Sequence, residues 1–491
     1  MRHRPRMFFA LGFVLITSTA CTHHRVQNVP IEGFFEAMST CRDEFAALDA
    51  RVETAGVQDT AYYRVPGFPY LRTDRLLASF ADEVTDFEQL SGWIRRMREL
   101  DQEAREFEYM NLGMSTQEAA ISRSRMQLCS STLAGLELEV PSNMTHLKSV
   151  VMPPDEYSTT RRALGLYPLS VPILRSRIEA KRENVRADFA TPLAELETKA
   201  PLTLWSVTPS MDPELVKNGF NRSVVDELGF PGLVASQWLA LAEAYAPHLW
   251  IESASESDVP GSPEWTESGV SVDTQNPVLN YHISFARFGG QPVVQITYFT
   301  WFKGRLESLP IDGTMWRVTL NLDAEPMLYE SIHTSGQSHQ VFPVQALQRR
   351  EHEGYFEQAP FFPQSNGSIP ARNAALRLKA GSHELRRVVF EIEAKAQEKK
   401  QYTLQRYEEL YFLKKPGGGT RSLFSPEGLI AQTERPDDSW MFASGVRQPG
   451  ALRQYGRHPI GYIGNSHFDD PFLLETIFVA PTTEKPRQPA G

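Results

Sequence analysis

The chain has 491 residues, of which 41% are hydrophobic and 22% are charged, as in an ordinary globular protein. This length allows roughly two to four domains with a sizeable core. The formal net charge of −10 argues against nucleic acid as the partner, and it predicts repulsion from anionic lipid surfaces.

Residues 1–20 have the pattern of a secretory signal peptide. Arg2, Arg4 and Arg6 precede an apolar run over residues 7–17, which falls short of the ~20 residues that a membrane-spanning helix needs. The segment Ser18-Thr19-Ala20-Cys21 then resembles the lipobox of bacterial lipoproteins, although Ser18 stands where that motif favours Leu.

This resemblance implies cleavage before Cys21, a diacylglycerol on its sulfur and a third chain, such as palmitate, on its amine. Two acyl chains already suffice for stable anchoring. Residues 21–30 would be the lipid-anchored tether, and Thr22 in place of Asp implies the outer membrane of a Gram-negative organism. An ordinary signal peptide cleaved after Ala20 is the alternative. Cleavage would change the formal charge to −13, so membrane contact is expected through the lipid and not through a basic patch.

Residues 31–150 are predicted to form a helical region. Apolar residues recur at three- and four-residue steps over 31–51 and 87–110, and Ser115-Thr116-Gln117-Glu118 is typical of a helix start. Residues 151–265 are predicted to be a linking helical region, with a charged helix over 173–190 and an apolar helix over 233–245.

Two cysteines remain besides Cys21, and both fall in predicted helices. Cys41 and Cys129 are expected to form a disulfide because an exported protein folds in an oxidising compartment. Two buried thiols that pack as small apolar side chains are the alternative.

Residues 266–480 are predicted to be β-rich, and residues 481–491 a disordered tail. Strands are expected over 278–288, 293–302, 314–322, 327–333, 385–392, 402–413 and 459–463. Short turns join most of them, so the sheet should be largely antiparallel. The aromatic residues of 298–302 are expected in the core, with a sugar- or peptide-binding face as the alternative. The chain is therefore predicted to be an α+β protein: a helical N-terminal region followed by a largely antiparallel β-rich C-terminal domain.

The sequence contains no GxSxG, HExxH, P-loop, GxGxxG, EF-hand or CxxC motif. Histidines are the remaining candidates for chemistry. His333 and His339 flank a turn at Gly336, while His458 and His467 flank Gly464. If the two segments converge, these four imidazoles, with Asp469 and Asp470, are candidate ligands of zinc or another transition metal.

His282 is a further candidate, because Asn280 and Ser284 share its polar strand face. Without a metal, histidines beside Ser338 or Ser466 would support acid–base or nucleophilic chemistry. Purely structural, hydrogen-bonded histidines are the alternative.

Three arginines cluster in this acidic chain. Arg447, Arg453 and Arg457 are candidate anion-binding residues because guanidinium groups bind carboxylates and phosphates in a bidentate manner. Salt bridges to the protein's own carboxylates are the alternative.

Two functions remain open from sequence. The first is an envelope-anchored lipoprotein that binds a partner protein or a ligand. The second is a metal-dependent hydrolase or another histidine-based enzyme in the β-rich domain. The sequence does not decide whether the chain is an enzyme.

Overall fold

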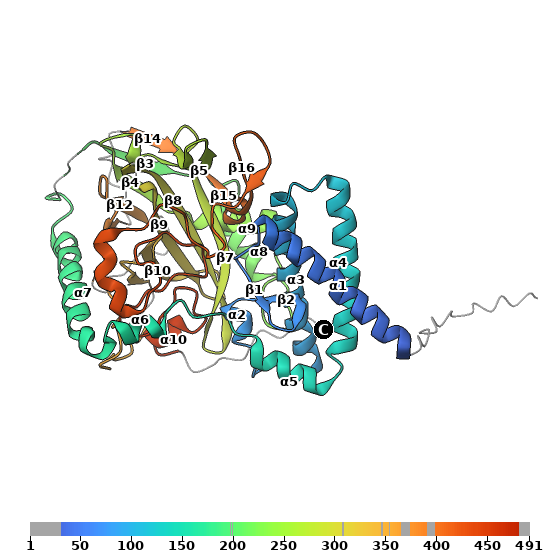
Figure 1. Ribbon diagram of the computed structural model, residues 1–491. Helices are drawn as coiled ribbons and strands as arrows, with labels where there is room; N and C mark the ends of the chain where they lie inside the picture. The colour runs from blue at the N-terminus through green and yellow to red at the C-terminus, as the bar shows by residue number, and fades with distance from the viewer. Residues whose placement is uncertain are drawn as a thin grey trace, which may run out of the picture.

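The computed structural model describes residues 31–196, 198, 200–306, 309–344, 347–352, 354–364, 374–389 and 398–480. The predicted signal peptide, Cys21, the tether and the predicted tail all lie outside these residues. Figure 1 shows an α+β protein in which a helical N-terminal part lies beside a β-rich part. No helix in the described ranges is both long enough and apolar enough to cross a bilayer.

The helical part contains four longer elements, one short helix and a β-hairpin. These are α1 (Ile31–Ala55), β1 (Tyr63–Val65), β2 (Phe68–Thr73), α2 (Arg75–Ala78), α3 (Phe87–Asn111), α4 (Thr116–Glu137) and α5 (Pro141–Val150). Local capping explains where two of the helices begin. The Asp86 side chain accepts from the backbone N–H of Gln89 at the start of α3, and Ser115 with Glu118 forms the predicted capping box of α4.

The core of the helical part contains the predicted cysteine pair. Cys41 on α1 and Cys129 on α4 lie at bonding distance, with 2.13 Å between their sulfurs, and both residues are buried. The hairpin packs between the helices and brings in Arg72, whose side chain is completely buried. Its guanidinium lies 2.7 Å from Glu108, 3.2 Å from Asp101 and 3.4 Å from Asp59, so a network of charges is buried under the hairpin.

The middle of the chain alternates helices with strands. Its elements are α6 (Thr159–Leu164), α7 (Tyr167–Ala190), β3 (Leu202–Ser206), α8 (Pro213–Asn221), α9 (Ala235–Tyr245) and β4 (His248–Glu252).

The rest of the chain forms most of two sheets. Its elements are η1 (Glu256–Asp258), β5 (Pro260–Thr266), β6 (Gly269–Asp273), β7 (Val278–Phe288), β8 (Gln291–Leu306), β9 (Leu309–Leu320), β10 (Pro326–His333), β11 (Gln340–Pro343), β12 (Ala375–Leu378), β13 (Leu385–Val389), β14 (Glu398–Gln401), β15 (Thr403–Arg406), η2 (Tyr407–Phe412), β16 (Leu413–Lys414), β17 (Thr420–Arg421), η3 (Pro436–Ser444) and α10 (Leu473–Ile477).

The large sheet has the strand order β11-β10-β9-β8-β5-β6, with β7 paired to β8 and β15 paired to β7. All of its pairs are antiparallel except β15 with β7. A smaller sheet has the order β13-β12-β4-β3-β14, in which β12 with β4 and β14 with β3 are parallel. The predicted, largely antiparallel β-rich part is therefore confirmed.

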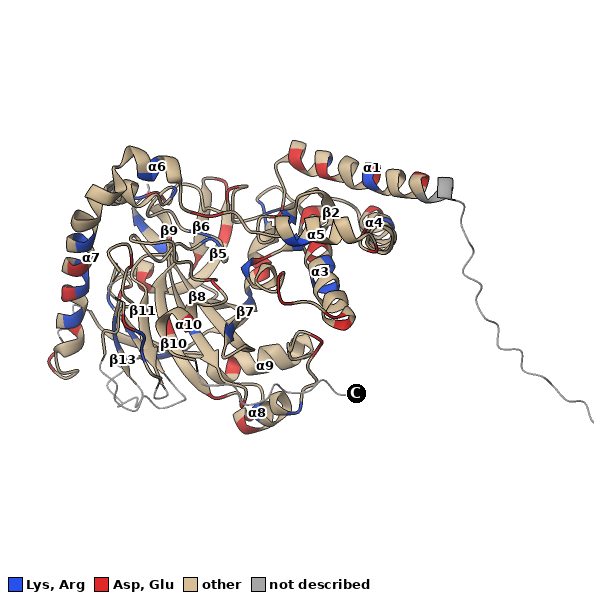
Figure 2. Ribbon diagram, turned by 90° about the horizontal axis from the view of Figure 1, so that it is seen from below, with Lys and Arg blue, Asp and Glu red and all other residues tan. Residues whose placement is uncertain are grey.

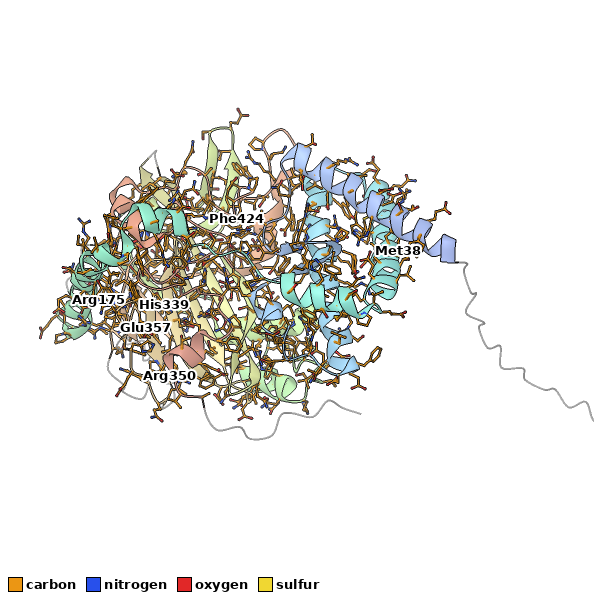
Figure 3. The ribbon with its side chains drawn as sticks, turned by 60° about the horizontal axis from the view of Figure 1, so that its bottom comes forward. Met38, Arg175, His339, Arg350, Glu357 and Phe424 are labelled. Carbon is orange, nitrogen blue, oxygen red and sulfur yellow. A yellow bond between two sulfur atoms is a disulfide. The ribbon has the colours of Figure 1, made fainter. Side chains whose placement is uncertain are left out.

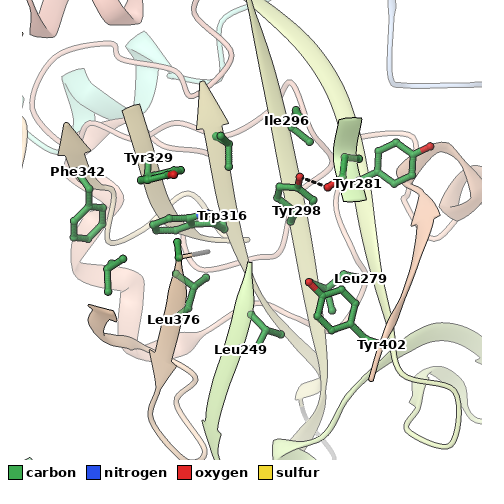
Figure 4. Packing of buried hydrophobic residues seen from close by; sticks show 14 of the residues in the cluster. Leu249, Leu279, Tyr281, Ile296, Tyr298, Trp316, Tyr329, Phe342, Leu376 and Tyr402 are labelled. Carbon is green, nitrogen blue, oxygen red and sulfur yellow. Dashed lines mark hydrogen bonds between the residues drawn. The ribbon is translucent and has the colours of Figure 1, made fainter. Parts of the chain in front are cut away.

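The two sheets pack face to face. In Figure 4, Leu249 and Leu376 of the small sheet lie opposite Leu279, Tyr298 and Trp316 of the large sheet. The opposite face of the large sheet is covered by the C-terminal segment, which packs against side chains such as Phe299 and Trp301. Since both faces of β8 are covered, its aromatic residues belong to the core, as the sequence predicts.

Several predicted boundaries change in the structure. The region predicted as linking helices contributes β3 and β4 to the small sheet, because strands more than a hundred residues away complete their pairing. Residues 402–413 form β15 and then the 3₁₀ helix η2 rather than one strand, and 459–463 contributes only an isolated bridge between Pro459 and His467. The helix predicted over 173–190 begins earlier, at Tyr167.

Candidate functional site

The two histidine-bearing segments pack against each other, as the metal hypothesis requires. His458 Nε2 donates to the Thr334 carbonyl at 3.1 Å, and the Arg453 amide donates to the same oxygen at 2.9 Å. Gly336 lies so close to the Pro459 carbonyl that an added Cβ would be 2.4 Å from its oxygen. The turn at Gly336 therefore needs a glycine, both for this contact and for its φ of 91°.

The four imidazoles nevertheless have four different partners. His333 binds Asp312 at 2.8 Å, His339 binds Glu330 at 2.8 Å and His467 lies 3.2 Å from Asp155. His458 is completely buried, and burial together with the charge of Arg453 lowers its pKa to about 3, so it stays neutral. Within the described ranges no three His, Cys, Asp or Glu side chains are grouped to hold a metal ion, so the zinc hypothesis finds no support there.

One local set has the partners of a hydrolytic triad. Ser335 Oγ lies 2.7 Å from His333 Nδ1, and His333 Nε2 lies 2.8 Å from Asp312. Ser335 is only 3% exposed, however, and its backbone N–H also donates to the same imidazole nitrogen at 3.1 Å. A substrate carbonyl would have no access to such a hydroxyl, so these contacts hold the turn together.

The candidate anion-binding arginines also have internal partners. Glu156 lies 3.6 Å from Arg453 and 3.3 Å from Arg457, and both guanidinium groups also donate to backbone carbonyls. Arg447 lies exposed at the surface. For Arg453 and Arg457, the contacts with Glu156 are the salt bridges of the alternative interpretation.

A cavity of about 290 Å³ lies where the helical part meets β7; we call it the junction cavity. Figure 1 shows β7 beside α2 and the β1–β2 hairpin. The walls of the junction cavity come from the hairpin region, α2, α3, Phe230, β7 and the C-terminal segment around residues 455–469. Pockets at domain junctions that combine apolar walls with a few convergent polar groups are the usual place for a ligand.

His282 on β7 is the central polar group of this wall. Its Nδ1 lies 2.8 Å from Glu408 Oε1, and both side chains are almost buried. Burial raises the pKa of Glu408, but the hydrogen bond and charge of His282, with Arg406, bring it below its usual value, so the carboxylate is ionised. Nε2 of His282 makes no hydrogen bond to any described residue, which leaves this atom for a ligand.

Two hydroxyl groups lie on the same wall. Ser284 follows His282 on the same face of β7, and the Tyr455 hydroxyl lies 2.9 Å from Ser284 Oγ. The Tyr455 ring lies 4.3 Å from the imidazole of His282, between centroids, so the aromatic residue fixes the plane of the histidine. The pair His282 and Ser284 matches the polar face that the sequence predicts.

In contrast to Glu408, three carboxyl groups that line the junction cavity have raised pKa values. Burial is the main cause for Asp74, for Glu103 and for Asp469, with repulsion from Glu408 adding to the effect at Glu103. Asp469 lies 3.1 Å from Arg75, and its Oδ1 is buried without a hydrogen bond to any described residue. Clusters of carboxyl groups with raised pKa values beside a histidine are typical of binding and catalytic sites.

A second cavity of about 480 Å³ lies near His339, Arg350 and Glu357 at the other end of the β-rich part (Figure 3). Its histidine is also paired with a carboxylate, because His339 binds Glu330. Glu330 is in turn held by Arg317, and both are buried. The two carboxyl groups on its wall, Glu351 and Glu357, are exposed, whereas those of the junction cavity are desolvated by burial, so the junction cavity is the stronger candidate.

Comparison with protein-family models, with curated proteins and with solved structures finds no match for this chain. A proposal for its function therefore rests on the fold and the junction cavity. The sequence pointed to His282 and Asp469 as possible metal ligands and to Ser284 as part of a polar strand face. Asp74, Glu103 and Glu408 carry no local signal, because only the folded chain brings Asp74 and Glu103 to the cavity and Glu408 to His282.

Proposed function

We propose that this chain is an envelope-anchored bacterial lipoprotein that binds a small polar ligand in the junction cavity. The observation that carries the binding role is His282, held by Glu408 with Nε2 left unpaired in a cavity lined by three carboxyl groups of raised pKa. The lipobox-like segment ending at Cys21 supports the anchor, and Thr22 supports the outer membrane of a Gram-negative organism.

The lining favours a ligand that presents hydrogen-bond donors. Asp74, Glu103 and Asp469 supply carboxyl oxygens, whereas Arg75 is already paired with Asp469. The rings of Phe230 and Phe285 add flat apolar surfaces to the same cavity. A hydroxylated or amine-bearing small molecule, such as a sugar or an amino sugar, fits this chemistry.

We expect Cys21→Ser to move the protein from the membrane fraction to the soluble fraction after a high-salt wash, because no acyl chain would remain to hold it. Cell fractionation with quantitative blotting measures this change, and mass spectrometry of the N-terminal peptide detects the lipid. Thr22→Ser keeps the cysteine and should stay in the membrane fraction. A Cys21→Ser protein that resists the wash would contradict the anchor.

Ligand binding is tested by titration calorimetry with neutral hexoses, hexosamines and polyamines as probes. We expect at least one probe class to bind. His282→Gln or Glu408→Gln should raise the Kd for that class by about ten-fold or more, as expected for a lost hydrogen bond to a charged or buried group. His146→Gln is the matched control because His146 lies exposed on α5. The proposal fails if no probe class binds, or if all three variants bind with the same Kd as the wild type.

A second candidate function is acid–base catalysis at the same cavity. The Glu408–His282 pair favours it, because a carboxylate that orients an imidazole is a common arrangement for a general base, and a protonated carboxyl nearby would serve as the acid. Incubating each bound probe with the protein and following it by NMR separates the two functions. Chemical conversion that His282→Gln abolishes and His146→Gln retains would favour the enzyme.

A further inference from the structure

The corner between α6 and α7 exposes four large aliphatic side chains. Leu164 is 73% exposed, Leu166 61%, Leu169 73% and Ile173 61%. We call this group the α6–α7 corner. A contiguous exposed apolar patch on a folded protein is typical of a surface that meets a partner or a membrane.

The first half of α7 is apolar on two sides. Tyr167, Val171, Leu174 and Ile178 face inward and pack in a cluster with Met441 and Tyr462. The corner residues occupy other positions of the same turns, so the exposed side chains are additional to those that the fold needs. Exposed aliphatic side chains on the side of a helix that does not face the core are typical of a surface that meets a partner or lipid.

The backbone holds the corner in a fixed shape. Leu166 has a φ of 48°, in the left-handed region that favours glycine, and the preceding Gly165 packs so closely that an added Cβ would lie 2.6 Å from Ala443 Cα. Pro172 has no N–H for the Pro168 carbonyl, which accepts from the Tyr355 hydroxyl at 2.7 Å instead. A leucine kept in a strained, exposed position points to a role outside the fold.

The charge around the corner is opposite to that of the whole chain. Residues 157–178 contain no Asp or Glu, but they contain Arg161, Arg162, Arg175 and Arg177. No carboxylate of the described ranges pairs with any of these four arginines, whose partners are carbonyls, Asn465 and aromatic rings. Figure 2 shows blue residues on α6, and both blue and red residues along α7. On α4, by contrast, Arg123 and Arg125 pair with Glu106 and Glu44.

We infer that the α6–α7 corner docks on an anionic phospholipid surface, with its aliphatic side chains among the acyl chains and its arginines at the headgroups. Arg161 and Arg162 are partly buried and donate to carbonyls such as those of Val446 and Ser444. The exposed Arg175 and Arg177 are therefore the two that would reach headgroups. Aliphatic side chains flanked by exposed arginines without a carboxylate partner among the described residues are complementary to such a surface. Only local charge matters there, because charges beyond about 10 Å are screened. Figure 1 supports the geometry: the start of α1, where the chain leads back to Cys21, lies along the same edge of the molecule as α5, α6 and the start of α7.

The test uses the chain without residues 1–20 and with Cys21→Ser, so that neither the apolar run of residues 7–17 nor a lipid contributes to binding. Its affinity is measured by flotation with vesicles of phosphatidylethanolamine and phosphatidylglycerol, and with vesicles in which phosphatidylcholine replaces phosphatidylglycerol. We expect binding to the anionic vesicles, and binding about 30-fold weaker after Arg175→Gln with Arg177→Gln. Leu166→Gly with Leu169→Ser should weaken it by at least about ten-fold.

Two controls distinguish a loss of docking from unfolding of the variant and from non-specific hydrophobic adsorption to vesicles. Leu166→Gly relieves a left-handed leucine and Leu169 is exposed, so the double variant should keep the wild-type melting temperature, and thermal unfolding of that variant shows whether lost binding reflects unfolding. Ile121→Ser with Leu128→Ser removes two exposed aliphatic side chains of α4 and should leave vesicle binding unchanged.

Three results would overturn the inference. These are absence of binding to anionic vesicles, equal losses in the corner and α4 variants, and binding to native membrane extracts but not to protein-free vesicles. The last result would assign the corner to a partner protein. None of these results depends on a ligand in the junction cavity or on lipid at Cys21.

Discussion

Replacing Arg72 by methionine is expected to lower the free energy of unfolding by about 3–5 kcal/mol at neutral pH, because a buried ion network would lose its central cation. The Arg72 side chain is 0% exposed and lies within 3.4 Å of carboxylate oxygens of Asp59, Asp101 and Glu108. Arg105 remains 2.8 Å from Asp101 but cannot reach all three carboxylates equally well. Methionine preserves the length and apolar stem of the side chain, so the loss would report charge rather than packing.

The loss of unfolding free energy caused by Arg72→Met should depend on pH. The direction of this dependence follows from the pKa values of the buried carboxyl groups. Burial already raises the pKa of Asp59 to about 7 even with Arg72 present, so this group costs stability as pH rises from its unfolded pKa through about 7. Without Arg72, the folded-state pKa values of Asp59 and Glu108 should both rise, because the charge of Arg72 lowers each of them. The deficit should therefore be largest near pH 8 and become smaller near pH 5, as the carboxyl groups take up protons.

Urea unfolding followed by circular dichroism at those two pH values measures both effects. Arg125→Met is the matched control, because Arg125 lies on the surface and pairs with the partly exposed Glu44, so its loss should cost less than about 1 kcal/mol. Arg72→Met with Glu108→Gln should recover part of the loss, because it removes one uncompensated charge. A deficit under about 1 kcal/mol, or one equal at both pH values, would show that the network does not depend on Arg72.

Local pattern was sufficient for the elements whose pairing is also local. The alternation over 278–288 and the turn at Gly289-Gly290 predict the β7–β8 hairpin, and both glycines have the positive φ that a two-residue turn favours. The capping box predicts the start of α4 in the same way. In both cases the residues that determine the element are close neighbours in the chain.

The sequence pattern could not predict the pairing of strands that are far apart in the chain. β3 and β4 are five residues each, and β4 pairs in parallel with β12, whose register joins His248 to Ala375. No pattern within residues 151–265 indicates that β3 and β4 pair with strands so far along the chain, so the sequence alone favours helices there. The same limit applies to the candidate site, where His282 and Ser284 are visible in one strand but Glu408 comes from 126 residues away.

The net charge of the whole chain likewise does not show the charge of a single surface region, which depends on how the folded chain is arranged. A net charge of −10 predicts that the body should avoid anionic lipid, yet the acids are absent from 157–178 and the arginines there have no carboxylate partners among the described residues. The raised pKa values of Asp74 and Asp469 likewise arise from burial, which only the folded chain creates. Both proposed binding sites therefore depend on where charge is placed rather than on the net charge of the chain.

Removing the Cys41–Cys129 disulfide is expected to lower the free energy of unfolding by about 4–5 kcal/mol, because an unfolded chain without this crosslink gains the entropy of a long open loop. The two cysteines are 88 residues apart in sequence, and they join α1 to α4 in the core of the helical part. Cys41→Ala with Cys129→Ala removes both thiols, so neither a free thiol nor an added hydroxyl complicates the comparison.

Urea unfolding with and without a reducing agent checks this expectation. The wild type should lose stability when it is reduced, whereas the double alanine variant should be insensitive to the reductant and close to the reduced wild type. The helical part should unfold first in the variant, so proteolysis within residues 31–150 should increase before the β-rich part is cut. Two reactive thiols in unreduced wild-type protein would contradict the crosslink, and a variant as stable as the oxidised wild type would contradict its contribution to the fold.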